Sequence, residues 1–145
     1  MLSIPSEVLA HIHAHGEQAF PEEGAGFLLG TDGEVRKVQQ LLPFSNRRED
    51  GARYNRYLIT AEDYLRGERE ADRLKLTLLG VFHSHPDHPN LPSEFDREWA
   101  QPYFSYVITS VEKGKALASR SWRLLEDRSA FIEETIEIKP NSKKE

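Results

Sequence analysis

Apolar and polar positions along the chain recur with two periods, one typical of helices and one typical of strands. Val8, Leu9 and Ile12 fall on one stripe at helical spacing, whereas residues 25–31 form a short apolar run that suits a buried strand. The pattern predicts, in order, a helix over 7–19, strands over 25–31 and 35–42, an extended segment over 54–59, a helix after residue 60, a strand over 76–83, a short helix after residue 93, and strands over 104–111, 116–124 and 131–138.

The starts of the two longer helices carry capping residues. Ser3 and Ser6 are candidate caps for the first helix. Thr60 is the candidate cap for the second, which has Glu62 and Asp63 in its first turn, where acidic residues favour the positive end of the helix dipole.

The segment from Leu76 to His83, LTLLGVFH, is the most apolar part of the chain, and we expect a central strand covered on both faces. Near the C-terminus, Ile132, Ile136 and Ile138 predict one face of a half-exposed strand. The other large side chains expected in the core are Tyr64, Leu65, Leu74, Trp99, Tyr103, Phe104, Tyr106 and Trp122.

Helices interspersed among strands predict an α/β (α+β) fold around one mixed sheet. The length of 145 residues suits a single hydrophobic core, and no internal repeat or flexible linker divides the sequence. We therefore expect a single domain over 1–145, with its core at about 5–138 and a frayed C-terminal tail over 139–145.

The composition narrows the classes of function. The chain has no cysteine, so a metal site must use His, Asp or Glu. The formal net charge of -5 argues against a dedicated nucleic-acid-binding protein, and we interpret the basic stretch of Arg47, Arg48, Arg53 and Arg56 as a solvated loop. Neither a secretory leader nor a membrane-spanning segment is visible, which makes the cytoplasm the expected location.

The candidate chemistry is concentrated between His83 and Asp96, in HSHPDHPNLPSEFD. His83 and His85 are two residues apart at a strand end, so both imidazoles fall on one face. Ser93 and Asp96 are three apart at a helix start, a spacing that also predicts a capping box. Two imidazoles and one carboxylate are the ligand set of a catalytic zinc that keeps one position open for water.

Hydrolysis at such a metal also needs a carboxylate outside the ligand set to act as the general base. Glu23 lies just before the apolar run at 25–31, with Gly24 and Gly26 after it to permit close approach. Its neighbour Glu22 is the alternative.

The remaining histidines have a simpler interpretation. His88 lies in the loop after His85, and we expect it to be an exposed loop residue rather than a ligand. His11, His13 and His15 alternate along a helix, where they cannot all meet one ion, so we expect them to be exposed.

Together these residues resemble the motif of the JAMM (MPN+) metallopeptidases, which combine a distant Glu with His-x-His, seven residues and Ser-x-x-Asp. The segment EGAGFLLG is similar to that family's Glu-x-Cys-Gly segment, and its register selects Glu23 over Glu22; Ala25 stands where many members have Cys. Covering roughly residues 5–124, the resemblance implies a curved sheet flanked by helices with a cytidine-deaminase-like architecture, one zinc ion on His83, His85 and Asp96, Glu23 as general base and acid, and Ser93 at the oxyanion.

The chain is also similar to the minimal prokaryotic members of that family, which process small ubiquitin-like, β-grasp sulfur carriers. This resemblance implies hydrolysis of a peptide or isopeptide bond after the C-terminal tail of such a carrier. We expect a monomer or homodimer and, from the charge and the short apolar runs, neither a nucleic-acid nor a membrane partner. Two other hypotheses are an MPN-type scaffold that binds a partner without cleaving it, and a nucleic-acid role suggested by distant relatives with a similar His-x-His-Pro loop.

Overall fold

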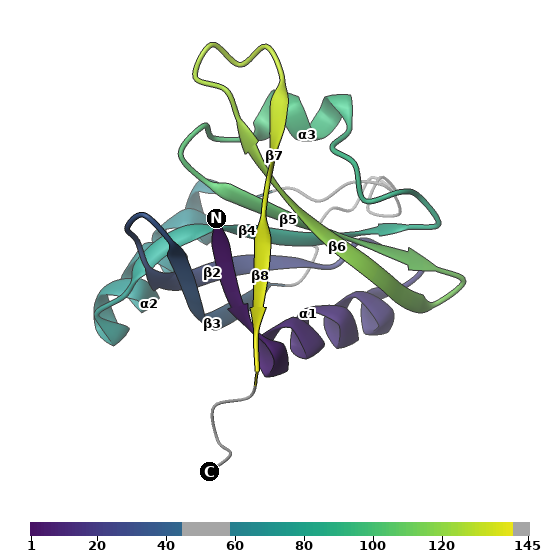
Figure 1. The fold of residues 1–145 in the computed structure, drawn as a ribbon, viewed down its shortest axis with the longest axis horizontal. Coiled ribbons are helices and arrows are strands. Elements are labelled where there is room, and N and C mark those ends of the chain that lie inside the picture. Colours follow the sequence, from purple (N-terminus) through teal and green to yellow (C-terminus); the bar gives the residue numbers. More distant parts are fainter. Residues whose placement is uncertain (45–58, 141–145) are drawn as a thin grey trace.

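The strands form one mixed sheet in the computed structural model, which describes residues 1–44 and 59–140. The order across this eight-stranded sheet is β7-β6-β5-β4-β2-β3-β1-β8 (Figure 1). The elements are β1 (Leu2–Pro5), α1 (Ser6–Ala19), β2 (Ala25–Thr31), β3 (Arg36–Phe44), α2 (Ala61–Leu74), β4 (Thr77–Pro86), α3 (Glu94–Trp99), β5 (Ser105–Glu112), β6 (Lys115–Leu124), β7 (Phe131–Glu134) and β8 (Ile136–Lys139). This arrangement confirms the α+β class expected from the sequence.

β4 is the central strand that the apolar segment predicts. It pairs antiparallel with β2 on one side and parallel with β5 on the other. Every β4 residue after Thr77 is buried, as expected for a strand covered on both faces. The strand continues to Pro86, three residues beyond the predicted end, so both His83 and His85 lie inside it.

The two ends of the sheet are joined by consecutive strands. β7 pairs with β6 and β8 pairs with β1, while Thr135 alone separates β7 from β8 in the chain. The sheet is therefore curved and nearly closed. The single strand expected over 131–138 is wrong, because the chain changes partners at Thr135, and Ile132 and Ile138 are 53% and 55% exposed. β1, which no sequence pattern predicted, completes this closure.

Two apolar layers cover the two faces of the sheet. The layer on the α2 face includes Phe27, Val81, Tyr106 and Ala71 of α2. The layer on the α1 face includes Phe82, Val107, and Val8 and Ile12 of α1. Because successive strand residues point to opposite faces, the next residues of β4 divide in the same way: His83 and His85 follow Val81, and Ser84 follows Phe82. Figure 1 shows α1 and α3 on opposite sides of the sheet.

The helix starts confirm one predicted cap and correct another. Thr60 and Asp63 form a capping box at the start of α2. α1 begins at Ser6 directly after Pro5, and no side chain caps it. Ser3 does not cap this helix because it is buried in β1.

Several large side chains expected in the core lie on the surface. Leu65 is 50% exposed because α2 turns Gly67 and Ala71 towards the sheet. Trp99 is 57% exposed and rests against Phe95 on the outside of α3. Tyr103 is 62% exposed and Trp122 is half-buried, whereas Phe104, Tyr106, Tyr64 and Leu74 contribute to the core as expected.

None of the helices in the described part of the chain is both long enough and apolar enough to cross a membrane. The expectations for the basic stretch at 47–56, most of the extended segment at 54–59 and the end of the tail at 141–145 fall outside the described residues.

Candidate metal centre

β4 carries the two histidines into the middle of the sheet. His83 lies between Ala25 of β2 and Ile108 of β5, and His85 pairs with Ser110 of β5. Both side chains are buried on the α2 face, with His83 only 1% exposed. Their ring centroids are 5.0 Å apart, so the predicted common face is confirmed.

The carboxylate of Asp96 reaches the histidines from the first turn of α3. The Ser93 hydroxyl accepts a hydrogen bond from the Asp96 N–H at 3.1 Å, and Asp96 Oδ2 accepts one from the Ser93 N–H at 2.8 Å. This reciprocal pair is the predicted capping box. It fixes both the start of the helix and the direction of the Asp96 carboxylate, which is 7% exposed.

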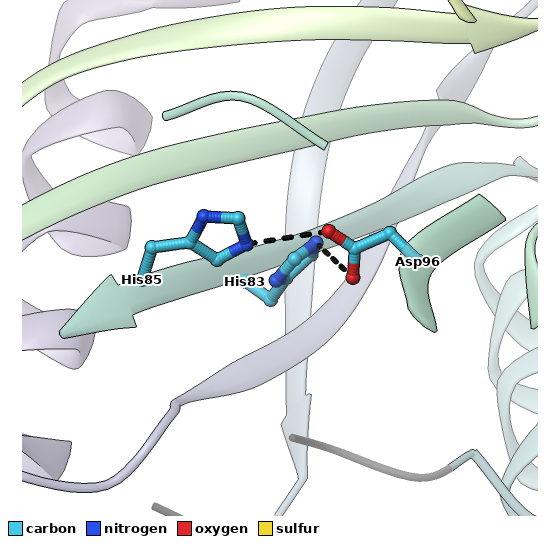
Figure 2. Close-up of side chains that lie close together, drawn as sticks. All are labelled: His83, His85 and Asp96. Atoms are coloured by element: carbon cyan, nitrogen blue, oxygen red, sulfur yellow. Dashed lines mark ion pairs between the residues drawn. The ribbon is translucent and has the colours of Figure 1, made fainter. Parts of the chain in front are cut away.

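The three predicted ligands converge on one point. Asp96 Oδ1 lies 3.7 Å from His83 Nε2, and Asp96 Oδ2 lies 3.3 Å from His85 Nε2. One ligand atom from each residue lies within 4.8 Å of the others, a grouping that can hold a metal ion. Figure 2 shows the imidazoles on β4 and the carboxylate on α3 pointing towards one another.

Burial sets the charges in this cluster. It lowers the pKa of the His83 imidazole to about 4, against the attraction of Asp96, so this ring is neutral near pH 7. Burial also opposes ionisation of Asp96, but the attraction of His83, the hydrogen bond with His85 and the Ser93 N–H together lower the pKa of Asp96 to about 2. A neutral imidazole and an ionised carboxylate are the forms that bind metals.

His85 is held in the orientation that is usual for a metal-binding histidine. His85 Nδ1 lies 2.8 Å from the Pro89 carbonyl oxygen, which can only accept, so Nδ1 carries a proton. The other ring nitrogen, Nε2, lies 3.3 Å from Asp96 Oδ2 and so faces the carboxylate. Hydrogen bonding of the second ring nitrogen to a carbonyl is also the usual support of a metal-binding histidine.

The loop that supplies the Pro89 carbonyl is fixed to the neighbouring strands. The Asp87 N–H donates to the Val111 carbonyl at 2.7 Å, and the Asn90 side-chain amide donates to the Ala118 carbonyl at 2.9 Å. The Trp122 indole N–H donates to the Asn90 carbonyl at 3.1 Å. These anchors were not found from the sequence, because Trp122 was assigned to the core rather than to this loop.

Glu23 lines a pocket of about 450 Å³ that one of the candidate metal ligands, His85, also lines. The residues that line the pocket are Glu23, His85, His88, Pro89, Leu91, Ser93, Glu94 and Phe95. Glu23 is 5% exposed, whereas its neighbour Glu22 is half-buried and is not one of the lining residues. The structure thus brings the carboxylate selected by the motif, and not its rival, to the pocket that His85 borders.

The other histidines divide into two groups. His88 is exposed as expected, and it also lines the pocket. His11 is exposed, but His13 and His15 are half-buried, which corrects the expectation for those two. His13 Nε2 lies 3.0 Å from the Ser119 hydroxyl, and the His15 ring packs edge-on against Phe82 with centroids 5.6 Å apart.

Two curated proteins are similar to the chain along most of their lengths. One is a probable TtuB-protein conjugate cleaving protease from Thermus thermophilus, 30% identical over 116 residues that cover 80% of this chain and 74% of that protein. The other is a desampylase from Pyrococcus furiosus, 30% identical over 104 residues that cover 72% of this chain and 68% of that protein.

Solved structures share the fold. A protein from Desulfitobacterium hafniense superposes with a TM-score of 0.84 at 29% identity, covering 99% of this chain and 96% of that chain. A JAB1/MPN domain protein from Archaeoglobus fulgidus superposes with a TM-score of 0.59 at 17% identity, covering 94% and 98% of the two chains.

A family model identifies the protein family to which the chain belongs. The model that describes prokaryotic homologues of the JAB domain matches residues 5–125, which include β4, α3 and the segment before β2. The matched region therefore contains Glu23, both histidines and Asp96. The chain belongs to the family of prokaryotic homologues of the JAB domain.

Proposed function

We propose that this protein is a JAMM-type zinc metallopeptidase that hydrolyses an amide bond at the C-terminal tail of a ubiquitin-like or sulfur-carrier protein. The observation that carries the proposal is the convergence of His83, His85 and Asp96 beside a pocket that Glu23 and Ser93 also line. The residues proposed as ligands, general base and oxyanion donor thus lie close together.

Zinc is the metal that best fits this ligand set. Two imidazole nitrogens and one carboxylate oxygen match the protein ligands of catalytic zinc sites. Thiolates are excluded because the chain has no cysteine. Zinc held by His83, His85 and Asp96 supplies a Lewis acid that polarises a carbonyl and acidifies water.

Glu23 and Ser93 act in the remaining steps of the hydrolysis, which are proton transfer and stabilisation of the oxyanion. Glu23 takes the proton of the attacking water and passes it to the departing amine, the role of a general base and acid. The Ser93 hydroxyl oxygen already accepts the Asp96 N–H, so its own proton is directed elsewhere and can donate to the oxyanion. Both residues line the pocket in which the scissile bond would lie.

The substrate class is supported by the names of the relatives. The Thermus thermophilus relative is named for cleaving TtuB-protein conjugates, and the Pyrococcus furiosus relative is named a desampylase. Hydrolysis at the flexible tail of a ubiquitin-like protein suits a pocket of about 450 Å³, because a tail can enter it and a folded domain cannot. The small carriers that were inferred from the sequence belong to the same substrate class.

One experiment separates the enzyme from a non-catalytic scaffold. The purified chain is analysed for its metal content and incubated with a small ubiquitin-like carrier joined through its C-terminus to a lysine side chain or to cysteine, with the products read by mass. We expect stoichiometric zinc and release of the intact carrier, loss of cleavage after chelation, and recovery when zinc is returned. Binding of the carrier without cleavage, in a chain that takes up no zinc, would support the scaffold instead.

A further inference from the structure

The segment that presents Glu23 is bonded to β4 through Ser84, one residue beyond the first pair of the β2–β4 ladder, Ala25 with His83. Ser84 donates its backbone N–H to the Gly24 carbonyl at 3.0 Å, and its side-chain Oγ accepts the Gly24 N–H at 2.9 Å. Both backbone polar groups of Gly24, the residue that follows Glu23, are thus fixed by Ser84, which is 3% exposed. The backbone bond is available to any residue, but the second bond requires a side-chain acceptor.

Ser84 lies between the two histidines and points away from them. As His83 and His85 face the α2 side, the side chain of Ser84 lies on the α1 face. Within residues 83–85 of β4, the two histidines therefore belong to the candidate metal site on the α2 face, and Ser84 bonds to the Glu23 segment from the α1 face. A shift at Ser84 alters the distance between the general base and the ligands.

The space around Ser84 accepts only a small side chain. A Cβ added to Gly16 of α1 would lie 3.2 Å from Ser84 Cβ and 3.1 Å from Val111 Cγ2, so the helix is packed tightly over this position. The same helix covers Gly24, where an added Cβ would lie 2.8 Å from His15 Cδ2. A residue at position 84 must be small, and it must accept a hydrogen bond; serine satisfies both requirements.

We infer that Ser84 is the positioning residue for the general base: it fixes the Gly24 peptide so that Glu23 is presented to the pocket at the distance that proton transfer requires. This inference rests on the proposed function. Ser84 touches neither substrate nor metal in this role, because its contribution passes through Gly24.

The expected effect of losing the hydroxyl follows from the steep dependence of catalysis on geometry. Ser84→Ala keeps the size of the side chain and the backbone bond, but it leaves the buried Gly24 N–H without its acceptor. A misplacement of 1 Å at a catalytic group lowers turnover by about 100-fold, so we expect kcat to fall on the order of 10-fold to 100-fold. KM and zinc content should stay close to those of the parent protein.

A matched control isolates the effect of the lost hydroxyl from a general loss of stability. Thr109 pairs with Ser84 across β4 and β5, is 1% exposed, and has its hydroxyl 2.6 Å from that of Ser119. Thr109→Val removes a buried hydroxyl from the adjacent strand without touching the Glu23 segment. Both variants should unfold at lower temperature than the parent, but only Ser84→Ala should lose turnover.

The decisive measurement combines Ser84→Ala with Glu23→Gln. Because Ser84 acts through Glu23, the Ser84→Ala change should reduce kcat in the parent protein and leave it nearly unchanged in the Glu23→Gln background. Full additivity of the two effects, or equal losses of kcat in Ser84→Ala and Thr109→Val, would overturn the positioning role. An unchanged kcat in Glu23→Gln alone would instead overturn the proposed general base, so the two failures are distinguishable.

Discussion

The two faces of β4 use neighbouring residues for different purposes. On the α2 face, His83 and His85 are buried with Asp96 in a polar cluster that could hold a metal ion. On the α1 face, Phe82 and Ser84 are buried against α1, in a layer formed by packing and by hydrogen bonds to the backbone. The α2 face of β4 thus carries the candidate metal ligands, and the α1 face packs against the helix that holds β4 in place.

This difference has a physical basis. Burying polar and charged groups costs free energy, so a site of this kind needs a rigid support that does not itself depend on the ligand. The α1 face supplies that support through close contacts such as those around Gly16. Changes to the polar cluster on the α2 face should therefore abolish turnover and spare the fold, whereas changes on the α1 face should only lower turnover.

The largest effect is expected for Asp96→Asn. An asparagine oxygen can still accept the Ser93 N–H, so the start of α3 is preserved, but the neutral amide is a poor substitute for a carboxylate between two imidazoles. We expect loss of both zinc binding and turnover with the fold retained. Metal analysis, circular dichroism and the cleavage assay measure these three properties.

The control for this variant is Ser93→Ala, which removes the cap and keeps the ligand. It should cost about 0.5–2 kcal/mol of stability and lower turnover through the lost oxyanion donor, yet it should still bind zinc. If Asp96→Asn retained stoichiometric zinc while Ser93→Ala lost it, the carboxylate would be acting as a helix cap and not as a ligand.

The next largest effect is expected for Glu23→Gln. The amide occupies nearly the same volume as the buried carboxylate but cannot take a proton from water, so kcat should fall on the order of 100-fold to 10,000-fold. Zinc content should not change, because Glu23 is outside the ligand set. Glu22→Gln, at the half-buried neighbour that does not line the pocket, should leave kcat close to that of the parent. If Glu22→Gln lost turnover and Glu23→Gln kept it, Glu22 would be the general base instead of Glu23.

The site was largely predictable because its geometry is local. A period of two places His83 and His85 on one face, and a spacing of three places Ser93 and Asp96 in one helical turn. Both facts follow from secondary structure alone. The choice of Glu23 over Glu22 came from the resemblance to a family, because residue patterns do not place a loop carboxylate within a pocket.

The missed features depend on contacts between distant segments. β1 has only four residues, too few to display a period, and its partners β3 and β8 begin 34 and 134 residues later in the chain. The change of partner at Thr135 is likewise set by the closure of the sheet. Ser84 was overlooked because its bond to Gly24 spans 60 residues; a small polar residue between the two candidate ligands was the available signal.

The smallest effect is expected for Gly16→Ala on the α1 face. Alanine favours a helix over glycine by about 0.5–1 kcal/mol, but its Cβ would meet Ser84 Cβ at 3.2 Å, so the neighbours must move by a few tenths of an ångström. At about 100-fold per ångström of misplacement, a shift of this size lowers kcat by roughly fourfold, with little change in melting temperature. Steady-state kinetics and thermal unfolding test this directly. A Gly16→Ala variant that is more stable than the parent and equally active would mean that the α1 face adjusts without disturbing the site, and that the two faces of β4 are not mechanically coupled.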